Sequence, residues 1–235
     1  MDLGLKGRAA FVAASSKGMG RAVAETFGRE GADVGMCARG SDALADAADA
    51  VRATGVRVSA TAADVRDAQQ AITALERAVQ ELGRLDALIV NAGGPPRGGF
   101  DDVDPDQWRG AFELTFMSAV NLVRAALPAL RQSDAAAIVF ISSWSVKQPI
   151  PGLTLSNSIR GAVSGLAKSL SIELAPQVRV NSLLPGTIRT DRQVELAQAA
   201  GASDVDAFLR GIARSIPLQR VGMPQEIANV AVFLA

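Results

Sequence analysis

Residues 14–20 have the types and spacing to bind a phosphate group. They read Ala-Ser-Ser-Lys-Gly-Met-Gly and lie between a short apolar run and a longer amphipathic stretch. Gly18 and Gly20 permit a tight turn and a close approach of the backbone to a pyrophosphate, whose charge the first N–H groups of a following helix attract. The segment predicts a dinucleotide site, although a purely structural turn would use the same residues.

The end of the second apolar run indicates which dinucleotide binds. Residues 36–39 read Met-Cys-Ala-Arg, with no carboxylate, and Lys17 lies in the glycine segment. A carboxylate here would bind the ribose 2′-hydroxyl of NAD, whereas cations suit the 2′-phosphate of NADP. We therefore expect NADP and consider NAD less favoured. The alternative is that Arg39 and Lys17 are solvated surface charges.

Strands and helices are expected to alternate along the chain. Strand-like apolar runs occur at residues 8–13, 33–38, 56–61, 85–90, 137–141 and 178–183. Helical patterns occur at residues 18–30, 41–53, 67–82, 105–130, 153–174 and 224–234, with Ser41 as an N-cap. This alternation predicts one α/β domain over residues 1–235, with a doubly wound parallel sheet of the Rossmann type and helices on both faces. The ligand is expected at the carboxyl ends of the strands.

Residues 194–215 are weakly helical and rich in alanine and glycine, within a possible lid over residues 187–215. They follow the last expected strand, where a mobile lid over the ligand site would lie. An ordinary pair of surface helices would have the same pattern, so both interpretations stay open.

The composition excludes several classes of function. Lys+Arg and Asp+Glu are equal at 24 each, so no excess of charge argues for nucleic acid. The chain has no histidine and one cysteine, Cys37, so we expect neither a metal site nor a disulfide framework. No apolar run approaches the ~20 residues that span a bilayer. We expect a cytoplasmic protein with a small-molecule substrate and no membrane segment.

Five motifs, each after an expected strand, resemble those of the short-chain dehydrogenase/reductase family, and the resemblance covers nearly the whole chain. The chain is most similar to a divergent subgroup that resembles β-ketoacyl-carrier-protein reductases and lacks the usual catalytic tetrad. The motifs are residues 14–20, Ala63-Asp64-Val65, Asn91-Ala92-Gly93, Ile141-Ser142-Ser143 and Leu184-Pro185-Gly186.

The resemblance implies roles for individual residues. Asp64 and Val65 would hold the adenine ring, and Ser143 would donate a hydrogen bond to the substrate oxygen. The implied catalytic positions are Ser143, Ser156, Arg160 and Thr115. The cofactor site would comprise Ser15, Ser16, Lys17, Gly18, Met19, Gly20, Arg39, Asp64, Val65, Asn91, Ala92, Gly93, Arg160, Pro185, Gly186, Ile188 and Thr190.

Three catalytic positions depart from the family's pattern. Thr115 stands where the family has asparagine, Ser156 where it has tyrosine, and Arg160 where it has lysine; Ala14 replaces the first glycine of the turn. A serine hydroxyl is a far weaker acid than a phenol, and an arginine stays protonated at physiological pH. Arg160 can bind ribose hydroxyls and supply positive charge, but it cannot shuttle a proton.

No tyrosine or histidine elsewhere in the chain can replace the missing phenol. Lys147 and Glu195 are candidate stand-ins, or else solvated surface residues. Trp144 and Phe100 are candidate walls of a substrate pocket, or else plain packing residues. General acid–base catalysis is worth about 10²–10⁴-fold, so its loss need not abolish hydride transfer.

Two functions remain open. The first is an NADP(H)-dependent oxidoreductase acting on a carbonyl or a secondary alcohol, with Ser156 or a neighbouring water passing the proton. The second is a nucleotide-binding sensor or scaffold without turnover. The family pairs subunits through its two long helices, which implies a homodimer or homotetramer. It also adds one strand after the last helix, so either a tail is absent from this sequence or the sheet lacks that strand.

Overall fold

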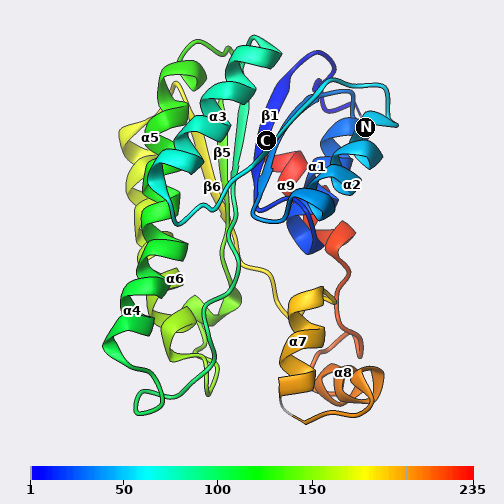
Figure 1. The fold of residues 1–235 in the computed structure, drawn as a ribbon, viewed down its shortest axis with the longest axis vertical. Coiled ribbons are helices and arrows are strands. Elements are labelled where there is room, and N and C mark those ends of the chain that lie inside the picture. The colour runs from blue at the N-terminus through cyan, green and yellow to red at the C-terminus, as the bar shows by residue number, and fades with distance from the viewer. Residues whose placement is uncertain (1, 200) are drawn as a thin grey trace.

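A six-stranded parallel sheet forms the centre of the computed structural model, which describes residues 2–199 and 201–235 (Figure 1). The strand order β3-β2-β1-β4-β5-β6 changes direction between β1 and β4. Ligands of such sheets bind at this point, outside the carboxyl ends of the strands. The expectation of a Rossmann-type sheet is confirmed. The strands are β1 (Ala9–Ala13), β2 (Asp33–Ala38), β3 (Val58–Ala62), β4 (Ala87–Val90), β5 (Ala137–Ile141) and β6 (Arg179–Leu183).

Helices cover both faces of the sheet (Figure 1). Strand side chains alternate between two cores: Phe11 and Phe140 pack on one face, and Val12 and Val139 on the other. Because both faces are buried, most strands are continuously apolar. On one face lie α1 (Gly18–Arg29), α2 (Ser41–Arg52) and α9 (Pro224–Leu234); on the other lie α3 (Ala68–Leu82), α4 (Pro105–Phe112), α5 (Ser118–Leu130) and α6 (Thr154–Glu173).

Two local expectations are wrong. The N-cap of α2 is Gly40, not Ser41, because the backbone is still extended at Gly40 and becomes helical one residue earlier than expected. The helix expected over residues 105–130 is interrupted by the π-helical turn η1 (Glu113–Met117), which separates α4 from α5. A π turn accommodates an extra residue within a helix and occurs frequently at functional sites.

Two short helices, α7 (Asp191–Ala199) and α8 (Val205–Ala213), stand apart from the sheet at the end where its strands finish (Figure 1). Their stem is a short pairing in which Arg189 N donates to Gly222 O at 2.8 Å and Gly222 N donates to Thr187 O at 2.9 Å. This places the expected lid beside the carboxyl ends of the strands, and its mobility stays a prediction. No helix in the described ranges has the length and apolarity to cross a membrane.

Candidate functional site

The turn after β1 is packed too tightly for any side chain at Gly20. A Cβ atom there would collide with the Ala14 carbonyl oxygen and lie 2.9 Å from Asn91 Nδ2. Asn91 follows β4 and donates to the carbonyl oxygens of Ala13 and Ala14 at 3.2 and 3.3 Å. Asn91 therefore fixes the turn to the centre of the sheet. Gly18 has a φ of +55°, which glycine adopts without strain.

The start of α1 is open to an anion. Its N-cap is Lys17, whose side chain makes no capping hydrogen bond, so the first N–H groups of the helix have no side-chain acceptor there. Ser15 is buried, and both its N–H and its hydroxyl donate to Cys37 O, at 3.0 and 3.3 Å. The side chain of Thr190, after β6, lies 3.4 Å from where a Gly18 Cβ would be. Thr190 therefore lies close to the glycine turn, beside the free N–H groups that could bind a pyrophosphate.

Arg39 stands exposed where β2 ends, beside the end of β3. Ala38 pairs with Ala62, so Arg39 and Asp64 follow neighbouring strand ends. Hydrogen bonds from Arg66 lower the pKa of Asp64 despite opposing burial, and the charge of Arg39 adds a smaller effect. Arg39 itself makes no ion pair or hydrogen bond with residues 2–199 or 201–235, so its guanidinium is available to a ligand.

Burial raises the pKa of the Cys37 thiol to about 11. The residue is fully enclosed at the end of β2, where it packs in the core beside Ala13. Cys37 is therefore a small apolar core residue and not a reactive thiol.

Ser143 and Arg160 are brought together where β5 ends. Arg160 Nη1 donates to the carbonyl oxygens of Ile141 and Ser142 at 3.3 and 3.2 Å, which places the guanidinium beside the residue that precedes Ser143. Ser143 Oγ accepts a hydrogen bond from Ser145 N at 3.2 Å, so its own O–H remains free to donate. Burial, with a lesser contribution from Arg192, lowers the pKa of Arg160 to about 10.

Ser156 lies one turn before Arg160 on the same face of α6. It is half-buried, and its hydroxyl makes no hydrogen bond with the described part of the chain. Asn157 beside it holds the preceding loop in place, since its side chain donates to Ile150 O at 2.9 Å and accepts from Ile150 N at 3.3 Å. No pattern in the sequence indicated this role for Asn157.

Thr115 lies within the π turn η1, and its hydroxyl is buried without a partner in the described residues. An unpaired buried hydroxyl costs about 1–3 kcal/mol, so this group favours a ligand or bridging water. The turn packs against α6, which carries Ser156 and Arg160. The position expected to replace the family's asparagine therefore has an irregular backbone and a free hydrogen-bonding group.

Arg192, on the first turn of α7, is a site residue that the sequence did not indicate. Its Nη2 donates to Pro95 O at 2.7 Å, and a Cβ on Gly94 would lie 3.2 Å from its Nε. The lid is thus attached above the end of β4, next to the motif that begins with Asn91. A second and weaker attachment joins Lys17 to Asp191 at 4.0 Å, between two exposed side chains.

The two expected proton donors are exposed. Lys147 follows the 3₁₀ turn η2 (Trp144–Val146), and Glu195 points from α7 to Arg192 at 3.5 Å. Of the two expected pocket walls, Trp144 is half-buried, and its backbone N–H donates to Pro185 O at 3.1 Å. Phe100 is 74% exposed, so it is not enclosed in a wall of this chain.

The remaining expected cofactor residues follow the same strand ends. Ile188 is buried on the lid stem, opposite Gly222. The others are Ser16 and Met19 in the glycine turn, the buried Val65 after β3, Ala92 and Gly93 after β4, and Pro185 and Gly186 after β6.

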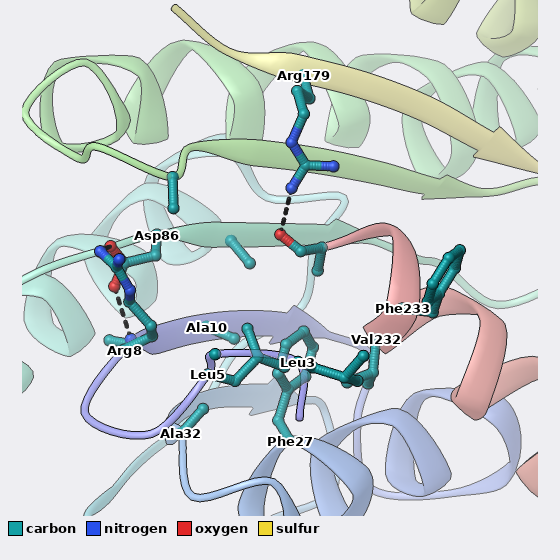
Figure 2. A pocket seen from close by; sticks show the side chains of 15 residues that line it. Leu3, Leu5, Arg8, Ala10, Phe27, Ala32, Asp86, Arg179, Val232 and Phe233 are labelled. Atoms are coloured by element: carbon teal, nitrogen blue, oxygen red, sulfur yellow. Dashed lines mark hydrogen bonds and ion pairs between the residues drawn. The ribbon is translucent and has the colours of Figure 1, made fainter. Parts of the chain in front are cut away.

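A partly open pocket of about 270 Å³ lies away from these residues, at the amino ends of the strands (Figure 2). Its walls include Leu5, Phe27 and Val232, and the ion pair of Arg8 with Asp86 lies at its edge. It is not the candidate site because ligands of this fold bind at the opposite strand ends. In the described ranges no three potential metal-ligating side chains gather at any point.

Comparisons with known proteins identify the family to which the chain belongs. A family model described as enoyl-(acyl carrier protein) reductase matches residues 13–235. Oxidoreductase UcpA of Escherichia coli O157:H7 is 33% identical over 233 residues, which are 98% of this chain and 88% of UcpA.

Two solved structures are similar over almost the whole chain. L-sorbose reductase of Gluconobacter frateurii, complexed with NADPH and L-sorbose, has a TM-score of 0.95 and 32% identity, covering 100% of this chain and 91% of that one. An NADPH-bound short chain oxidoreductase of Pseudomonas aeruginosa PAO1, described as containing an atypical catalytic center, has a TM-score of 0.89 and 34% identity, covering 97% of this chain and 89% of that one. The chain belongs to the short-chain dehydrogenase/reductase family of oxidoreductases.

Proposed function

We propose that the chain is an NADPH-dependent oxidoreductase that interconverts a carbonyl compound and a secondary alcohol. The observation that carries the proposal is that Ser143 and the guanidinium of Arg160, which is bound to the carbonyl oxygen of Ser142, both lie at the end of β5, beside the switch point of the sheet. A free hydroxyl donor and a cation at this point can bind a carbonyl oxygen and stabilise the negative charge that develops on it. A pure scaffold would not need a substrate-facing serine.

The cofactor site is proposed along the strand ends from β3 to β6. The open start of α1 would bind the pyrophosphate, Arg39 and Lys17 the 2′-phosphate, and Asp64 with Val65 the adenine. Arg160 would bind the ribose hydroxyls. The bound cofactor would supply the hydride. Two solved relatives contain NADPH, which supports NADP over NAD.

The chain's own residues limit how the proton is delivered. Ser143 donates a hydrogen bond to the substrate oxygen, and the Ser156 hydroxyl lies on the α6 face that carries Arg160. Because a serine hydroxyl does not ionise at working pH, Ser156 is proposed to orient a water that provides the proton. The unpaired hydroxyl of Thr115 is proposed to hold a second water of this chain.

The competing function is a nucleotide-binding sensor or scaffold. It is favoured by the replacement of the phenol and the ammonium by Ser156 and Arg160. The structural relative from Pseudomonas aeruginosa, whose catalytic center is described as atypical, is nevertheless an oxidoreductase that binds NADPH. A departure from the usual tetrad therefore does not by itself favour the sensor.

Two measurements test the proposal. NADPH fluorescence on mixing reports binding, and loss of NADPH absorbance with a panel of aldehydes and ketones reports turnover. Ser143→Ala should lower kcat/KM by about 10²-fold, because it removes a hydrogen bond that strengthens in the transition state. Ser145→Ala is the matched control, since its buried hydroxyl has no partner in the described residues and its backbone N–H is unchanged. NADPH binding without any turnover would favour the sensor, and no binding would reject both functions.

A homodimer or homotetramer is proposed from the outer helices. Phe112 on α4 and Ile172 on α6 are 40% and 70% exposed, and an interface between subunits along these helices would cover both side chains. Analytical ultracentrifugation would reject the assembly if only monomers sedimented. A cytoplasmic location is proposed as well, consistent with a single reduced cysteine; fractionation of expressing cells tests it.

A further inference from the structure

Arg160 is a cation without a counter-ion. Its hydrogen bonds go to two backbone carbonyl oxygens, and in residues 2–199 and 201–235 no carboxylate lies within 4.0 Å of its guanidinium. The ribose hydroxyls proposed to bind it are neutral, so they satisfy its donors without compensating its charge. The guanidinium is partly buried, so water screens its charge only in part, and no carboxylate of the described residues compensates it. An anion bound beside it would supply that compensation.

A second guanidinium, that of Arg192, contacts the loop that follows the neighbouring strand β4. It is fixed by the carbonyl oxygen of Pro95, five residues after the end of β4, whereas Arg160 is fixed by carbonyl oxygens at the end of β5. These strands are adjacent, with Val90 opposite Phe140. Repulsion by Arg192 contributes to the lowered pKa of Arg160, which places the two cations close together.

The hydrogen bonds of Arg192 leave most of its donors unused. A guanidinium has five N–H groups in a fixed planar fork, and one donates to Pro95 O at 2.7 Å. Its ion-pair partner Glu195 is 3.5 Å away and 64% exposed, so this pair contributes little. Arg192 can therefore exchange Glu195 for a better placed carboxylate without losing its attachment to the backbone.

The loops at the rim add positive charge. Arg97 Nη2 lies 3.9 Å from where a Gly152 Cβ would be, and the exposed Lys147 follows η2. The loop that carries Arg97 pairs with the one that precedes α6, through Gly98 N to Gly152 O at 2.9 Å. The same loop also carries the exposed carboxylates of Asp101 and Asp102, so the rim holds charges of both signs and a preference for an anion would depend on Arg192.

We propose that the substrate is a small oxo acid or hydroxy acid whose carboxylate pairs with Arg192, next to the carbonyl group bound by Ser143 and Arg160. The proposal rests on the proposed function and names its substrate class. In the reductive direction the carbonyl carbon accepts a hydride from NADPH and the oxygen takes a proton from water. An oxo acid thus becomes a hydroxy acid while NADPH becomes NADP⁺.

The experiment compares acids with their neutral esters in binding. Pyruvate, methyl pyruvate, acetoacetate and methyl acetoacetate are titrated by calorimetry into the full chain with saturating NADP⁺, which has no hydride to transfer. We expect at least one acid to bind about 10- to 100-fold more tightly than its ester, since a charge-assisted bidentate pair is lost with the ester. Arg192→Gln should abolish this preference, and Arg192→Lys should keep part of it.

Arg189→Gln is the matched control, because it removes the same charge from the lid stem at a side chain that pairs with Asp206. It should keep the preference for the acid. Absence of a preference in both pairs, or an unchanged preference in Arg192→Gln, would overturn the proposal. The two proposals fail separately. Carbonyl reduction without preference for acids rejects only the carboxylate site, whereas acid binding without NADPH oxidation by any carbonyl rejects only the enzyme.

Discussion

Arg39 offers the sharpest test of cofactor choice, through the variants Arg39→Gln and Arg39→Asp. The guanidinium is exposed at the end of β2 and has no partner in the described part of the chain, so neither substitution disturbs the fold. Arg39→Gln removes the charge that faces the proposed 2′-phosphate. Arg39→Asp adds a repulsive charge as well, and it supplies an acceptor for the ribose 2′-hydroxyl of NAD.

The size of the effect follows from the exposure of Arg39. A charge-assisted hydrogen bond contributes about 1.5–3 kcal/mol, and solvent screening of an exposed side chain favours the lower end. Repulsion between a carboxylate and a phosphate of about −1.5 charge, roughly 6 Å apart in a water-like dielectric, adds about 1 kcal/mol. NADPH affinity should therefore fall about 10-fold in Arg39→Gln and about 60-fold in Arg39→Asp. Lys17 limits both losses because it can still reach the phosphate.

The assay is fluorescence titration with NADPH and with NADH at one ionic strength, since screening weakens the effect as salt rises. NADH affinity should change less than about threefold in either variant, because NADH carries no 2′-phosphate. Arg131→Asp, an equal change of charge at the exposed end of α5, should leave both affinities unchanged. Equal losses for NADPH and NADH would refute the argument, and so would unchanged NADPH affinity in Arg39→Asp.

Three further changes probe the turn, the catalytic pair and the opposite end of the sheet. Gly20→Ala should lower the melting temperature by roughly 5–10 °C and weaken NADPH binding, since its Cβ collides with a backbone carbonyl; Gly211→Ala in α8, where nothing lies within 4 Å, should do neither. Ser156→Tyr combined with Arg160→Lys should raise the reduction rate about 10²-fold or more by restoring a general acid, and no gain in stopped-flow NADPH oxidation would contradict this. Burial favours a raised pKa for Asp86, but hydrogen bonds from Arg84, Ser133 and Ala9 N outweigh it and lower the pKa. Asp86→Asn should therefore cost about 2 kcal/mol of unfolding free energy at pH 7. A carboxyl group with a lowered pKa stabilises the fold fully only above its pKa in the unfolded chain, which is about 4. In urea titrations, the stability difference between the wild-type chain and Asp86→Asn should therefore shrink as the pH falls below about 4. A stability difference that is independent of pH would contradict the reasoning.

The central strands were predictable because both of their faces are buried. β2 and β5 occupy the residue ranges expected from their apolar runs, since no polar residue had to be placed on a solvent face. β3 begins later than expected, at Val58. The residue before it, Arg57, forms an ion pair with Asp33 through its side chain. At such an edge the tertiary partner, and not the run of apolar residues, decides where the strand starts.

The site was predictable where its residues directly follow a strand. Asn91 and Ser143 occupy such positions, and parallel strands bring their ends to one edge of the sheet. Arg192 lies in a segment of weak pattern, and its role arises from a contact with Pro95 that is distant along the chain. The π turn was equally invisible, because no residue type marks the place where a helix takes up an extra residue.

The π turn also divides the long helix into two units that can vary separately. α5 belongs to the sheet, where Leu122 and Leu130 are fully enclosed, whereas α4 belongs to a small core of its own with Val103, Leu155 and Ile159. A regular helix would tie their orientations together, since each residue adds a rotation of about 100°. Because the π turn takes up the extra residue, α4 and the loop before it can change during selection for another substrate. The sheet and α5, which position the cofactor site, need not change with them.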